Sequence, residues 1–489
     1  MDVISAKEIE EKVCQLLKRA NFYLPKDVYG ALTHSLTMED FVTAKAILNI
    51  LLENAAIAQS ESVPICQDTG IDVVFVEIGQ ELRIDGDLYE AINRGVARGT
   101  KEGYLRASVC DAISRKNSGD NTPAVVHVQL MSGAGLAITV LPKGCGSENM
   151  SRLKMLPPSS GLEGVEDFVV ECVKKAGPNP CPPGIIGVGI GGTMELSAIL
   201  SKKALCRPIG SRNQEKAISD LETRLLERIN RLGIGPQGLG GGTTSLSVAV
   251  ETHPCHIASL PVAVNIQCHA ARRSTIFYEN GCWMEKDEAT HISSTKDQGL
   301  SSLLEDAVRL SLPLSKADVM NLRAGQWVLI TGRLLTARDQ THRRLCELIK
   351  QKQGLPVDLD GQLIYYVGPS PAPPGKVVGA AGPTTSYRMD AYTPKLLEKG
   401  VLGLMGKGKR SEEVRAAIQA HGAVYLSTIG GAGAYLSRAI KDARIIAFED
   451  LGPEALYEFY VEDFPAVVIN DSTGQDYYEM VQDESKVNL

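Results

Sequence analysis

Several features that mark common classes of protein are missing from this chain of 489 residues. Its 51 basic residues are outnumbered by 58 acidic ones, so the net charge is −7. Because phosphate backbones bind to a basic face, this balance argues against nucleic acid as a partner. No apolar run reaches the roughly 18 residues of a membrane-spanning helix, so no membrane partner is expected. We expect a cytoplasmic protein, since signal and transit peptides avoid the acids found near this N-terminus (Asp2, Glu8, Glu10 and Glu11).

The 11 cysteines include no C-x-x-C pair, which argues against a zinc ribbon and against a thioredoxin-like redox motif. An odd number of cysteines in a long chain without a secretion signal also argues against a disulfide framework. Four cysteines lie in helical or otherwise ordinary sequence and are expected to be buried packing residues: Cys14, Cys172, Cys206 and Cys346.

Two familiar motifs are present only in incomplete form. An aspartic protease needs two aspartates that share a proton, but D-T-G occurs once, at 68–70, and "NDSTG" at 470–474 does not supply a second copy. The stretch "GVGIGGT" at 187–193 lacks a clean G-x-G-x-x-G followed by an acid about 20 residues later. Neither a protease nor a dinucleotide site is expected, and these glycines are interpreted as close strand–helix packing.

The composition is that of a globular protein, with 44% hydrophobic and 22% charged residues. A chain of this length predicts two or three domains. The polar segment around "EKDEATHISSTKDQG" is the best candidate linker. We therefore predict an α/β protein with an N-terminal domain over 1–285, a linker over 286–303 and a C-terminal domain over 304–489.

Hydrophobic periodicity places the cysteine-bearing motifs on loops. It predicts helices over 8–22, 39–58, 87–101, 163–176 and 212–232. A buried strand, "IDVVFVEIG", follows "PICQDTG", so Cys66 and Asp68 are expected on a loop that enters a strand. Residues 124–151 predict two strands and then a glycine-rich loop, whereas 243–273 predict two strands around a loop rich in His, Cys and Pro.

Three cysteines have surroundings that suit a metal ligand. Cys66 lies on the loop just described, and Cys181 lies in "NPCPPG", a Cys-Pro context that recurs at iron–sulfur ligands. Cys268 ends an apolar strand before "HAARR", whose positive charge would favour the thiolate. Three thiolates on a four-iron cube would leave one iron open to a substrate oxygen. Spacing alone does not choose among the cysteines, and Cys110, Cys255 and Cys282 stay open at this point.

Five motifs, taken together and in this order, resemble the iron–sulfur-dependent hydro-lyases of the class I fumarase family: "PICQDTG", "PKGCGSENMS", "NPCPPGIIGVGIGGT", "HIASLPVAVNIQCHAARR" and "GPTTSYRMD". The resemblance implies the fused form, with an N-terminal α/β cluster-binding domain and a C-terminal swivelling β/β/α-type domain. It implies a [4Fe–4S] cluster on Cys66, Cys181 and Cys268, a homodimer, and the reversible hydration of fumarate to (S)-malate, a small dicarboxylate. L-tartrate dehydratase and mesaconate hydratase are alternatives within the family, and a non-catalytic zinc-binding protein is the alternative from another class.

The resemblance also implies roles for individual residues. Thr384 would act as the base with Asp68 and His256 as partners, because a threonine hydroxyl needs a neighbouring group to take or hold its proton; His253 competes with His256. Arginine forks match carboxylates and glycine-rich turns form anion nests. The residues expected to bind substrate are Gln67, Arg106, Lys143, Gly144, Ser147, Asn149, Arg338, Thr385, Arg388 and Lys407. Cys145 has no assigned role.

The predicted residues come from both domains. Thr384 and Arg388 belong to the C-terminal domain, whereas the three cysteines belong to the N-terminal domain. We therefore expect the active site in a cleft between the domains, which opens and closes during turnover.

Overall fold

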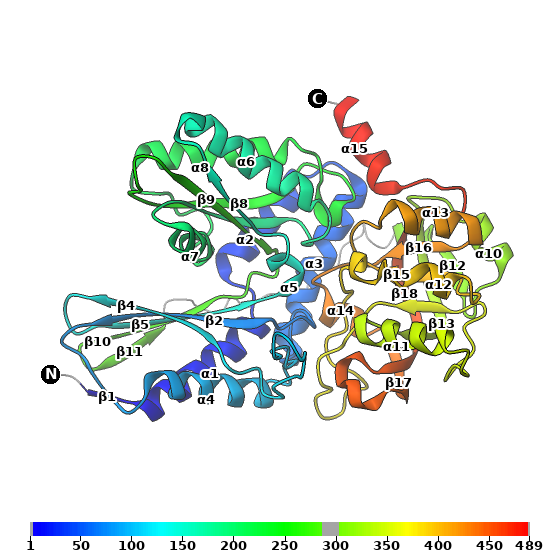
Figure 1. Ribbon diagram of the computed structural model, residues 1–489, viewed down its shortest axis with the longest axis horizontal. Coiled ribbons are helices and arrows are strands. Elements are labelled where there is room, and N and C mark those ends of the chain that lie inside the picture. Colours follow the sequence, from blue (N-terminus) through cyan, green and yellow to red (C-terminus); the bar gives the residue numbers. More distant parts are fainter. Residues whose placement is uncertain (1–2, 286–302, 488–489) are drawn as a thin grey trace.

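The computed structural model describes residues 3–285 and 303–487, which form an N-terminal and a C-terminal half lying side by side (Figure 1). Each half has its own β-sheets with helices packed against them, so the predicted mixed α/β class is confirmed. All but the last residue of the predicted linker 286–303 lie outside the described residues. The predicted domain boundaries stay predictions.

The first sheet of the N-terminal half has the strand order β11-β10-β5-β2-β4. Within it, β2 (Ile71–Gly79) runs parallel to β4 (Val125–Met131) and antiparallel to β5 (Leu136–Lys143). β2 is largely buried and follows the loop of Cys66 and Asp68, as predicted. The other strands in this region are β10 (Ser274–Glu279) and β11 (Cys282–Glu285), with β1 (Val3–Ser5) and β3 (Arg83–Asp85) as a separate pair.

The second sheet, of order β6-β9-β7-β8, repeats this plan. β7 (Gly184–Gly191) runs parallel to β8 (Ser245–His253) and antiparallel to β9 (Leu260–Cys268), with β6 (Arg152–Leu156) at the edge. The predicted strand pairs β4/β5 and β8/β9 are therefore present, but in each pair a third strand lies between the two. As a result, the end of β9 lies beside the beginning of β7.

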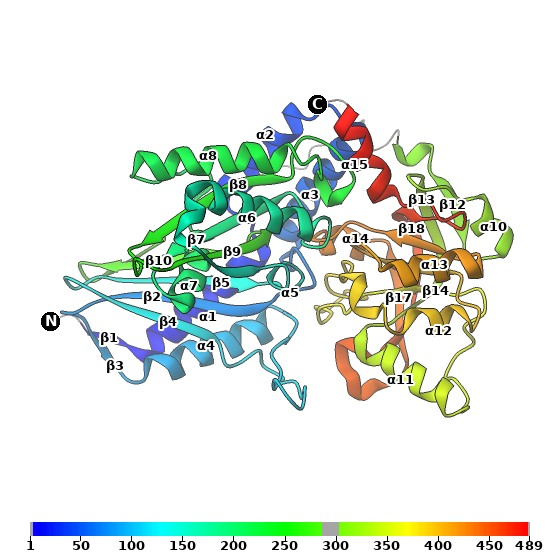
Figure 2. The same cartoon turned by 45° about the horizontal axis from the view of Figure 1, so that its top comes forward.

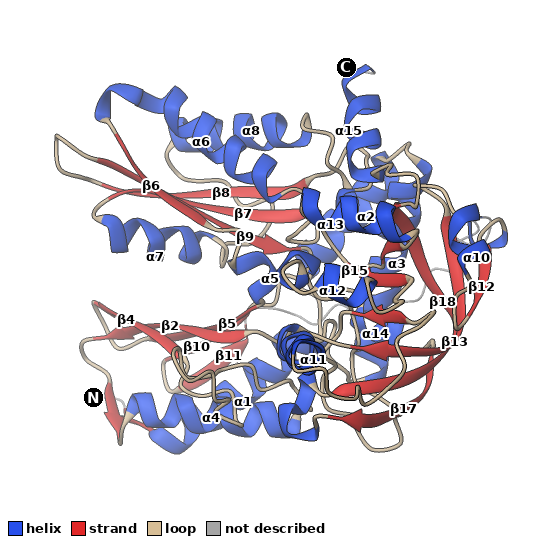
Figure 3. Ribbon diagram, turned by 45° about the vertical axis from the view of Figure 1, so that its right-hand side comes forward, coloured by secondary structure: helices blue, strands red, loops and turns tan. Residues whose placement is uncertain are grey.

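Helices pack against these sheets through their buried apolar side chains. Ser5 caps the first helix in a reciprocal arrangement with Glu8. α7 (Met194–Ala204) lies between the two sheets (Figure 3), and its Lys203 Nζ donates to Glu77 Oε1 of β2 at 2.7 Å. The helices predicted over 8–22, 87–101, 163–176 and 212–232 are observed as α1 (Ala6–Phe22), α4 (Leu88–Glu102), α6 (Gly161–Ala176) and α8 (Lys216–Asn230). Short helical turns are α5 (Cys145–Glu148), η1 (Pro158–Ser160) and η2 (Pro236–Gly238).

α3 (Val42–Glu61) joins the two halves. It is shifted three residues towards the C-terminus from the predicted 39–58, and it follows α2 (Lys26–Met38). Thirteen of its residues are buried, as expected for a helix surrounded by protein. It packs against α14 (Gly433–Ser437) of the C-terminal half (Figure 2). One apolar core includes residues of both halves.

The C-terminal half is built on a seven-stranded sheet of order β12-β13-β14-β15-β16-β18-β17. β13 also pairs antiparallel with β18, so β13, β14, β15, β16 and β18 form a closed ring of paired strands. The strands are β12 (Val308–Ser311), β13 (Trp327–Thr336), β14 (Leu363–Tyr365), β15 (Gly403–Gly406), β16 (Val424–Ser427), β17 (Ile440–Ala447) and β18 (Leu456–Asn470).

Short helices surround this ring, and the candidate site lies on the side that faces α3. Among the described helices, none combines the length and hydropathy that a membrane crossing requires. The remaining helices of this half are α10 (Lys316–Asn321), α11 (Asp339–Lys350), η3 (Ser386–Met389), α12 (Thr393–Leu397), α13 (Glu412–His421), η4 (Glu449–Glu454) and α15 (Tyr477–Val487).

Candidate active site

Three buried cysteines from separate loops meet near the junction of the halves. Cys66 lies between α3 and β2, Cys181 precedes β7, and Cys268 ends β9. Their exposed fractions are 7%, 2% and 8%. Cys268 pairs with Gly184, three residues after Cys181, and each thiol lies within electrostatic range of the other two. The structure therefore brings together the three cysteines that the sequence singled out.

The surroundings of these thiols combine burial with a cation. Burial raises the pKa of Cys66 and raises that of Cys181 to about 12, although Lys407 acts in the opposite direction on both. Lys407 Nζ lies 2.5 Å from Cys181 Sγ and is in electrostatic range of all three thiols. A metal group that binds thiolates would reverse the preference for the neutral thiol, because a coordinating thiol is deprotonated outright.

A glycine-rich loop, 430–433, closes over the cysteines from the C-terminal half. A Cβ on Gly430 would lie 2.3 Å from Cys181 Sγ, and one on Gly433 would lie 3.2 Å from Cys66 Cα. The side-chain amide of Gln237 bonds both the N–H and the C=O of Gly430, at 2.9 and 3.1 Å. Asn54 of α3 donates to Gly431 O at 3.1 Å. Only glycine fits at positions 430 and 433 without moving the cysteine loops.

The donors gathered here suit an iron–sulfur group. Among the residues that the structure describes, no group of three or more His, Cys, Asp or Glu side chains is placed to hold a single metal ion. In a four-iron cube each cysteine binds a different iron, so the three sulfurs need not converge on one point. The three buried thiols and the glycines that let the loop 430–433 approach them therefore fit the predicted cluster.

Asp68 lies among positive charges from both halves. Its Oδ1 accepts a hydrogen bond from Arg106 Nη2 at 2.9 Å. Burial favours the neutral acid, but neighbouring cations hold the pKa of Asp68 well below its ordinary value. These cations are Arg106, Arg272, Lys407 and Arg338. The carboxylate is therefore ionised at neutral pH, unlike the protonated member of a protease dyad.

Arg106 is brought to the site, where three of its five N–H donors are occupied. Besides Asp68, its Nη1 donates to Gly368 O at 2.8 Å and its Nε to Ser108 Oγ at 3.2 Å. Thr69 Oγ1 accepts from the Arg106 amide at 2.9 Å. The side chain is thus positioned to orient Asp68.

Arg338 and Arg388 lie together beside Arg106 and keep donors free. Arg338 Nη2 is 3.2 Å from Glu454 Oε1, and Arg388 Nη2 is 3.0 Å from Asp339 Oδ2. The buried Nε of each arginine has no hydrogen-bond partner among the described residues. Both arginines also lie in electrostatic range of Arg106. Three guanidinium groups close together favour an anion between them.

The predicted glycine-rich anion loop contains the short helix α5, and its role in substrate binding stays a prediction. Lys143 is fully buried and donates to Ser147 Oγ at 2.9 Å and to Ile266 O at 2.8 Å. Glu148 lies 3.2 Å from its Nζ, and burial lowers the pKa of Lys143 to about 8. Lys143 and Ser147 therefore hold the turn in place. Asn149 is exposed at its end.

The glycines of this turn let the backbone approach charged groups. A Cβ on Gly144 would lie 2.7 Å from Arg272 Nη2 and 3.3 Å from Asp68 Oδ2. A Cβ on Gly146 would lie 3.2 Å from Lys407 Nζ. Gly144 therefore lies at the site, where its lack of a side chain leaves room for Arg272 and Asp68.

Thr384 is buried close to the cysteine loops. Its amide donates to Tyr366 O at 2.7 Å, while its hydroxyl makes no hydrogen bond within the described part of the chain. Gln67 connects this loop to Cys66, because Gln67 Nε2 donates to Pro383 O at 3.1 Å. Thr385 Oγ1 lies 3.5 Å from Asn179 O. The threonine hydroxyl is available, but the expected contacts with Asp68 and His256 are not made.

His256 is not brought to this site within the chain. It is exposed in the turn between β8 and β9, where its Nδ1 accepts from the Ala258 amide at 3.1 Å. Cys268 lies at the opposite end of β9, roughly 27 Å away for eight extended residues. His253 shares the exposed turn. His256 and Cys268 lie in one sequence motif, but the nine-residue strand β9 separates them in the fold.

Some residues at the site were missed. Arg272 is 1% exposed, and its Nη1 donates to the backbone oxygen of Asp68. His269 Nδ1 lies 3.1 Å from Cys181 O, and burial lowers the pKa of this histidine to about 4. Both belong to "CHAARR", so the signal was present. Gln237 lies in "GPQG" and gave no signal, because its function is a contact with a distant loop.

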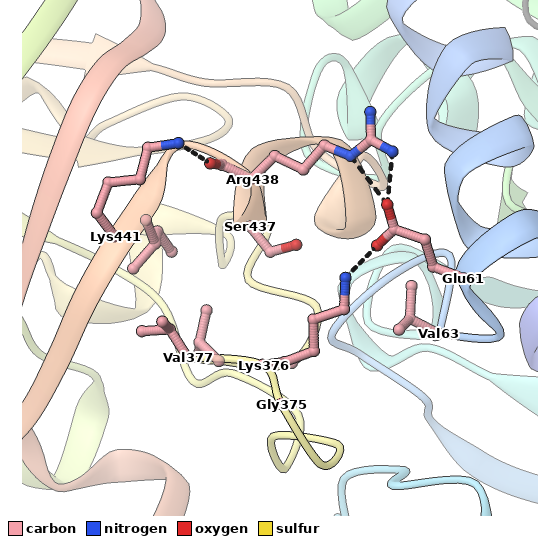
Figure 4. A pocket seen from close by; sticks show the side chains of 11 residues that line it. Glu61, Val63, Gly375, Lys376, Val377, Ser437, Arg438 and Lys441 are labelled. Atoms are coloured by element: carbon pink, nitrogen blue, oxygen red, sulfur yellow. Dashed lines mark hydrogen bonds and ion pairs between the residues drawn. The ribbon is translucent and has the colours of Figure 1, made fainter.

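A separate pocket of about 280 Å³ lies nearby at the junction of the halves (Figure 4). Glu61 of α3 accepts from Lys376 Nζ at 2.6 Å and from Arg438 Nη2 at 2.5 Å. The apolar side chains of the lining are Val63, Val377, Val378 and Ile440. The two cations are thus already paired, and this pocket links the halves without contributing to the cysteine site.

Both halves of the chain match known families. Residues 10–277 match the family described as Fumarate hydratase (Fumerase), and residues 281–481 match the one described as Fumarase C-terminus.

The chain is 31% identical over 516 residues to a putative fumarate hydratase class I of Geobacillus stearothermophilus, covering 99% of this chain and 98% of that protein. It is 31% identical over 460 residues to the anaerobic class I fumarate hydratase of Escherichia coli, covering 89% and 83%. Over 274 residues it is 44% identical to a putative L(+)-tartrate dehydratase subunit alpha of Methanocaldococcus jannaschii, covering 55% of this chain and 96% of that one.

Proposed function

Because this chain belongs to the class I fumarate hydratase family of hydro-lyases, we propose that it reversibly adds water to fumarate to form (S)-malate. The family resemblance inferred from the sequence is confirmed. One observation carries the proposal: buried thiols of the N-terminal half meet cationic side chains of both halves at a single junction. Family membership leaves no support for the alternative of a non-catalytic zinc-binding protein.

We assign Cys66, Cys181 and Cys268 as the ligands of a [4Fe–4S] cluster. When bound, such a cluster supplies a Lewis acid that makes the substrate hydroxyl a better leaving group. The burial of all three thiols and the mutual proximity of their sulfurs support this assignment. The ammonium of Lys407 beside Cys181 offsets part of the negative charge that three thiolates would bring.

The cations would hold the two carboxylates of the substrate. Arg338 and Arg388 have unpaired Nε donors, and a guanidinium fork matches a carboxylate with two parallel hydrogen bonds. Lys407 would contact the carboxylate nearer the cysteines. Arg106 would orient Asp68, since its three nitrogens are already engaged. Extra negative charge that develops as a carbon-bound proton leaves would be stabilised by these cations.

Thr384 would take the proton from carbon 3 of malate. Its hydroxyl has no partner within the described residues. Because a neutral hydroxyl is a poor base, Thr384 would first have to pass its own proton to solvent before it could accept the proton from carbon 3. Asp68, held ionised by its cations, would orient the threonine–substrate pair. We assign no step to His256, because it lies far from the cysteines within the chain.

L-tartrate is the second candidate substrate, since 44% identity links the N-terminal half to a tartrate dehydratase subunit. The full-length match to fumarate hydratases favours fumarate. The deciding experiment measures iron and sulfide in anaerobically purified protein and assays malate, L-tartrate and citramalate. Four irons per chain with turnover of malate supports the proposal. Preferred turnover of tartrate would replace it, and a zinc protein without iron would refute it.

A further inference from the structure

A chain of buried hydrogen bonds holds the backbone on both sides of Lys407. The Lys407 amide donates to Ser386 Oγ at 3.1 Å, and the Tyr425 hydroxyl contacts both Ser386 Oγ at 2.9 Å and Gly408 O at 2.8 Å. A phenol has one proton and a carbonyl only accepts, so Tyr425 donates to Gly408 and accepts from Ser386. The Ser386 amide completes the arrangement by donating to Lys407 O at 2.9 Å.

The residues of this hydrogen-bond network are held in place by burial and by further contacts. Ser386 and Tyr425 are fully buried, and the guanidinium of Arg410 lies 5.0 Å from the centre of the Tyr425 ring. Arg410 is fixed in turn by Asp390 at 2.7 Å and by Thr393 Oγ1 at 2.7 Å. A buried, fully paired network of this kind rigidifies the backbone that it holds.

The same network reaches the loop of the proposed base. Arg410 also lies 5.4 Å from the ring of Tyr366, whose carbonyl accepts the Thr384 amide at 2.7 Å. Two distant segments of the C-terminal half, one carrying Thr384 and one carrying Lys407, therefore share a single buried support.

We propose that Ser386 and Tyr425 are positioning residues for Lys407. They fix the backbone from which its ammonium reaches Cys181 Sγ and, in the proposed reaction, a substrate carboxylate. This inference rests on the proposed function. A lysine side chain loses rotamer entropy when it is held in one place. A fixed backbone restricts where the ammonium can lie, and a misplacement of about 1 Å can cost about 10²-fold in rate.

A double-mutant cycle tests the proposal. Ser386→Ala and Tyr425→Phe each remove one hydroxyl, and each is combined with Lys407→Met in the full, cluster-loaded chain. We expect each single change to lower kcat/KM by about 10-fold or more, but by less than about 2-fold once Lys407 is already replaced. Thr428→Val is the matched control, since it removes a nearby buried hydroxyl bond, to Pro465 O at 2.8 Å, and leaves the hydroxyls of Ser386 and Tyr425 in place.

The control separates positioning from general stability. Thr428→Val is expected to lower the melting temperature without changing kcat/KM. If the loss of kcat/KM caused by Ser386→Ala or Tyr425→Phe is as large with Lys407→Met as without it, the proposal is overturned. If Tyr425→Phe does not fold, Ser386→Ala carries the same test.

Crystal structures of the variants distinguish failure of this inference from failure of the proposed function. If the wild-type protein turns over none of the substrates, the proposed function fails, but the separation of Lys407 Nζ from Cys181 Sγ can still be measured. We expect this separation to increase in Ser386→Ala and Tyr425→Phe and to stay at its wild-type value in Thr428→Val. An unchanged separation in all three variants would refute the positioning role.

Discussion

Lys407 Nζ lies 2.5 Å from Cys181 Sγ, although 226 positions separate the two residues. Lys407 follows β15 in the C-terminal half, whereas Cys181 precedes β7 in the N-terminal half. The contact therefore crosses the junction, next to the loop that Gln237 and Asn54 hold in place. Changes on either side of the junction are expected to affect the same site.

Replacing any of Cys66, Cys181 or Cys268 by alanine is expected to remove the cluster. Each variant should lose most of its iron, sulfide and visible absorbance, because a thiolate ligand of the cube is gone. Cys172→Ala is the control: this buried cysteine of α6 packs in the core, so its loss should cost only about 1 kcal/mol of stability. A Cys181→Ala protein with a complete cluster and full activity would show that the ligand set is wrong.

Thr384→Ala is expected to lower kcat by about 10²- to 10⁴-fold, as for loss of a general base. The visible spectrum of the cluster should be unchanged, because Thr384 holds no iron in this proposal. Thr384→Ser keeps the hydroxyl and should keep much of the activity. Near-full turnover by the alanine variant would remove the threonine from the mechanism.

Arg388→Lys keeps the positive charge but loses the planar fork. We expect KM for malate to rise by about 10-fold or more, since hydrogen bonds to charged groups contribute about 1.5–3 kcal/mol each. Arg333→Lys, at an ion pair with Glu458 on the surface of β13, serves as the control and should leave KM unchanged. Equal KM values for the two variants would argue that Arg388 does not touch the substrate.

Asp72 is expected to make stability depend on pH. Burial raises the pKa of this carboxyl from 3.8 to about 7, although a hydrogen bond from Asn121 opposes the rise. The folded protein then binds more protons than the unfolded chain between these values. The stabilisation is complete below about pH 4 and is lost as the pH rises through 7.

Unfolding of the wild-type chain and of Asp72→Asn at several pH values tests this expectation. Asparagine imitates the neutral acid at all pH values, so the wild type should lose stability relative to the variant between pH 5 and pH 8. A stability difference that stays constant over this range would mean that Asp72 does not titrate there.

Local sequence indicated several of the helices and the three cysteines that we assign as ligands. The periodicity of α1, α4, α6 and α8 follows from side chains within each segment, and burial of these helices agrees with the pattern. Cys66, Cys181 and Cys268 were found through short motifs that each lie on one loop. Such features depend on residues that are close together in the sequence, so the sequence alone can reveal them.

Only the tertiary structure decided which side chains meet. The place of β7 between β8 and β9 sets Cys268 beside Cys181 and leaves His256 at the far end of β9. Lys143 is used inside the protein, while Arg272 and Gln237 reach the site. These outcomes depend on strand order and on packing between halves, because contacts across hundreds of residues leave no periodic trace in the sequence.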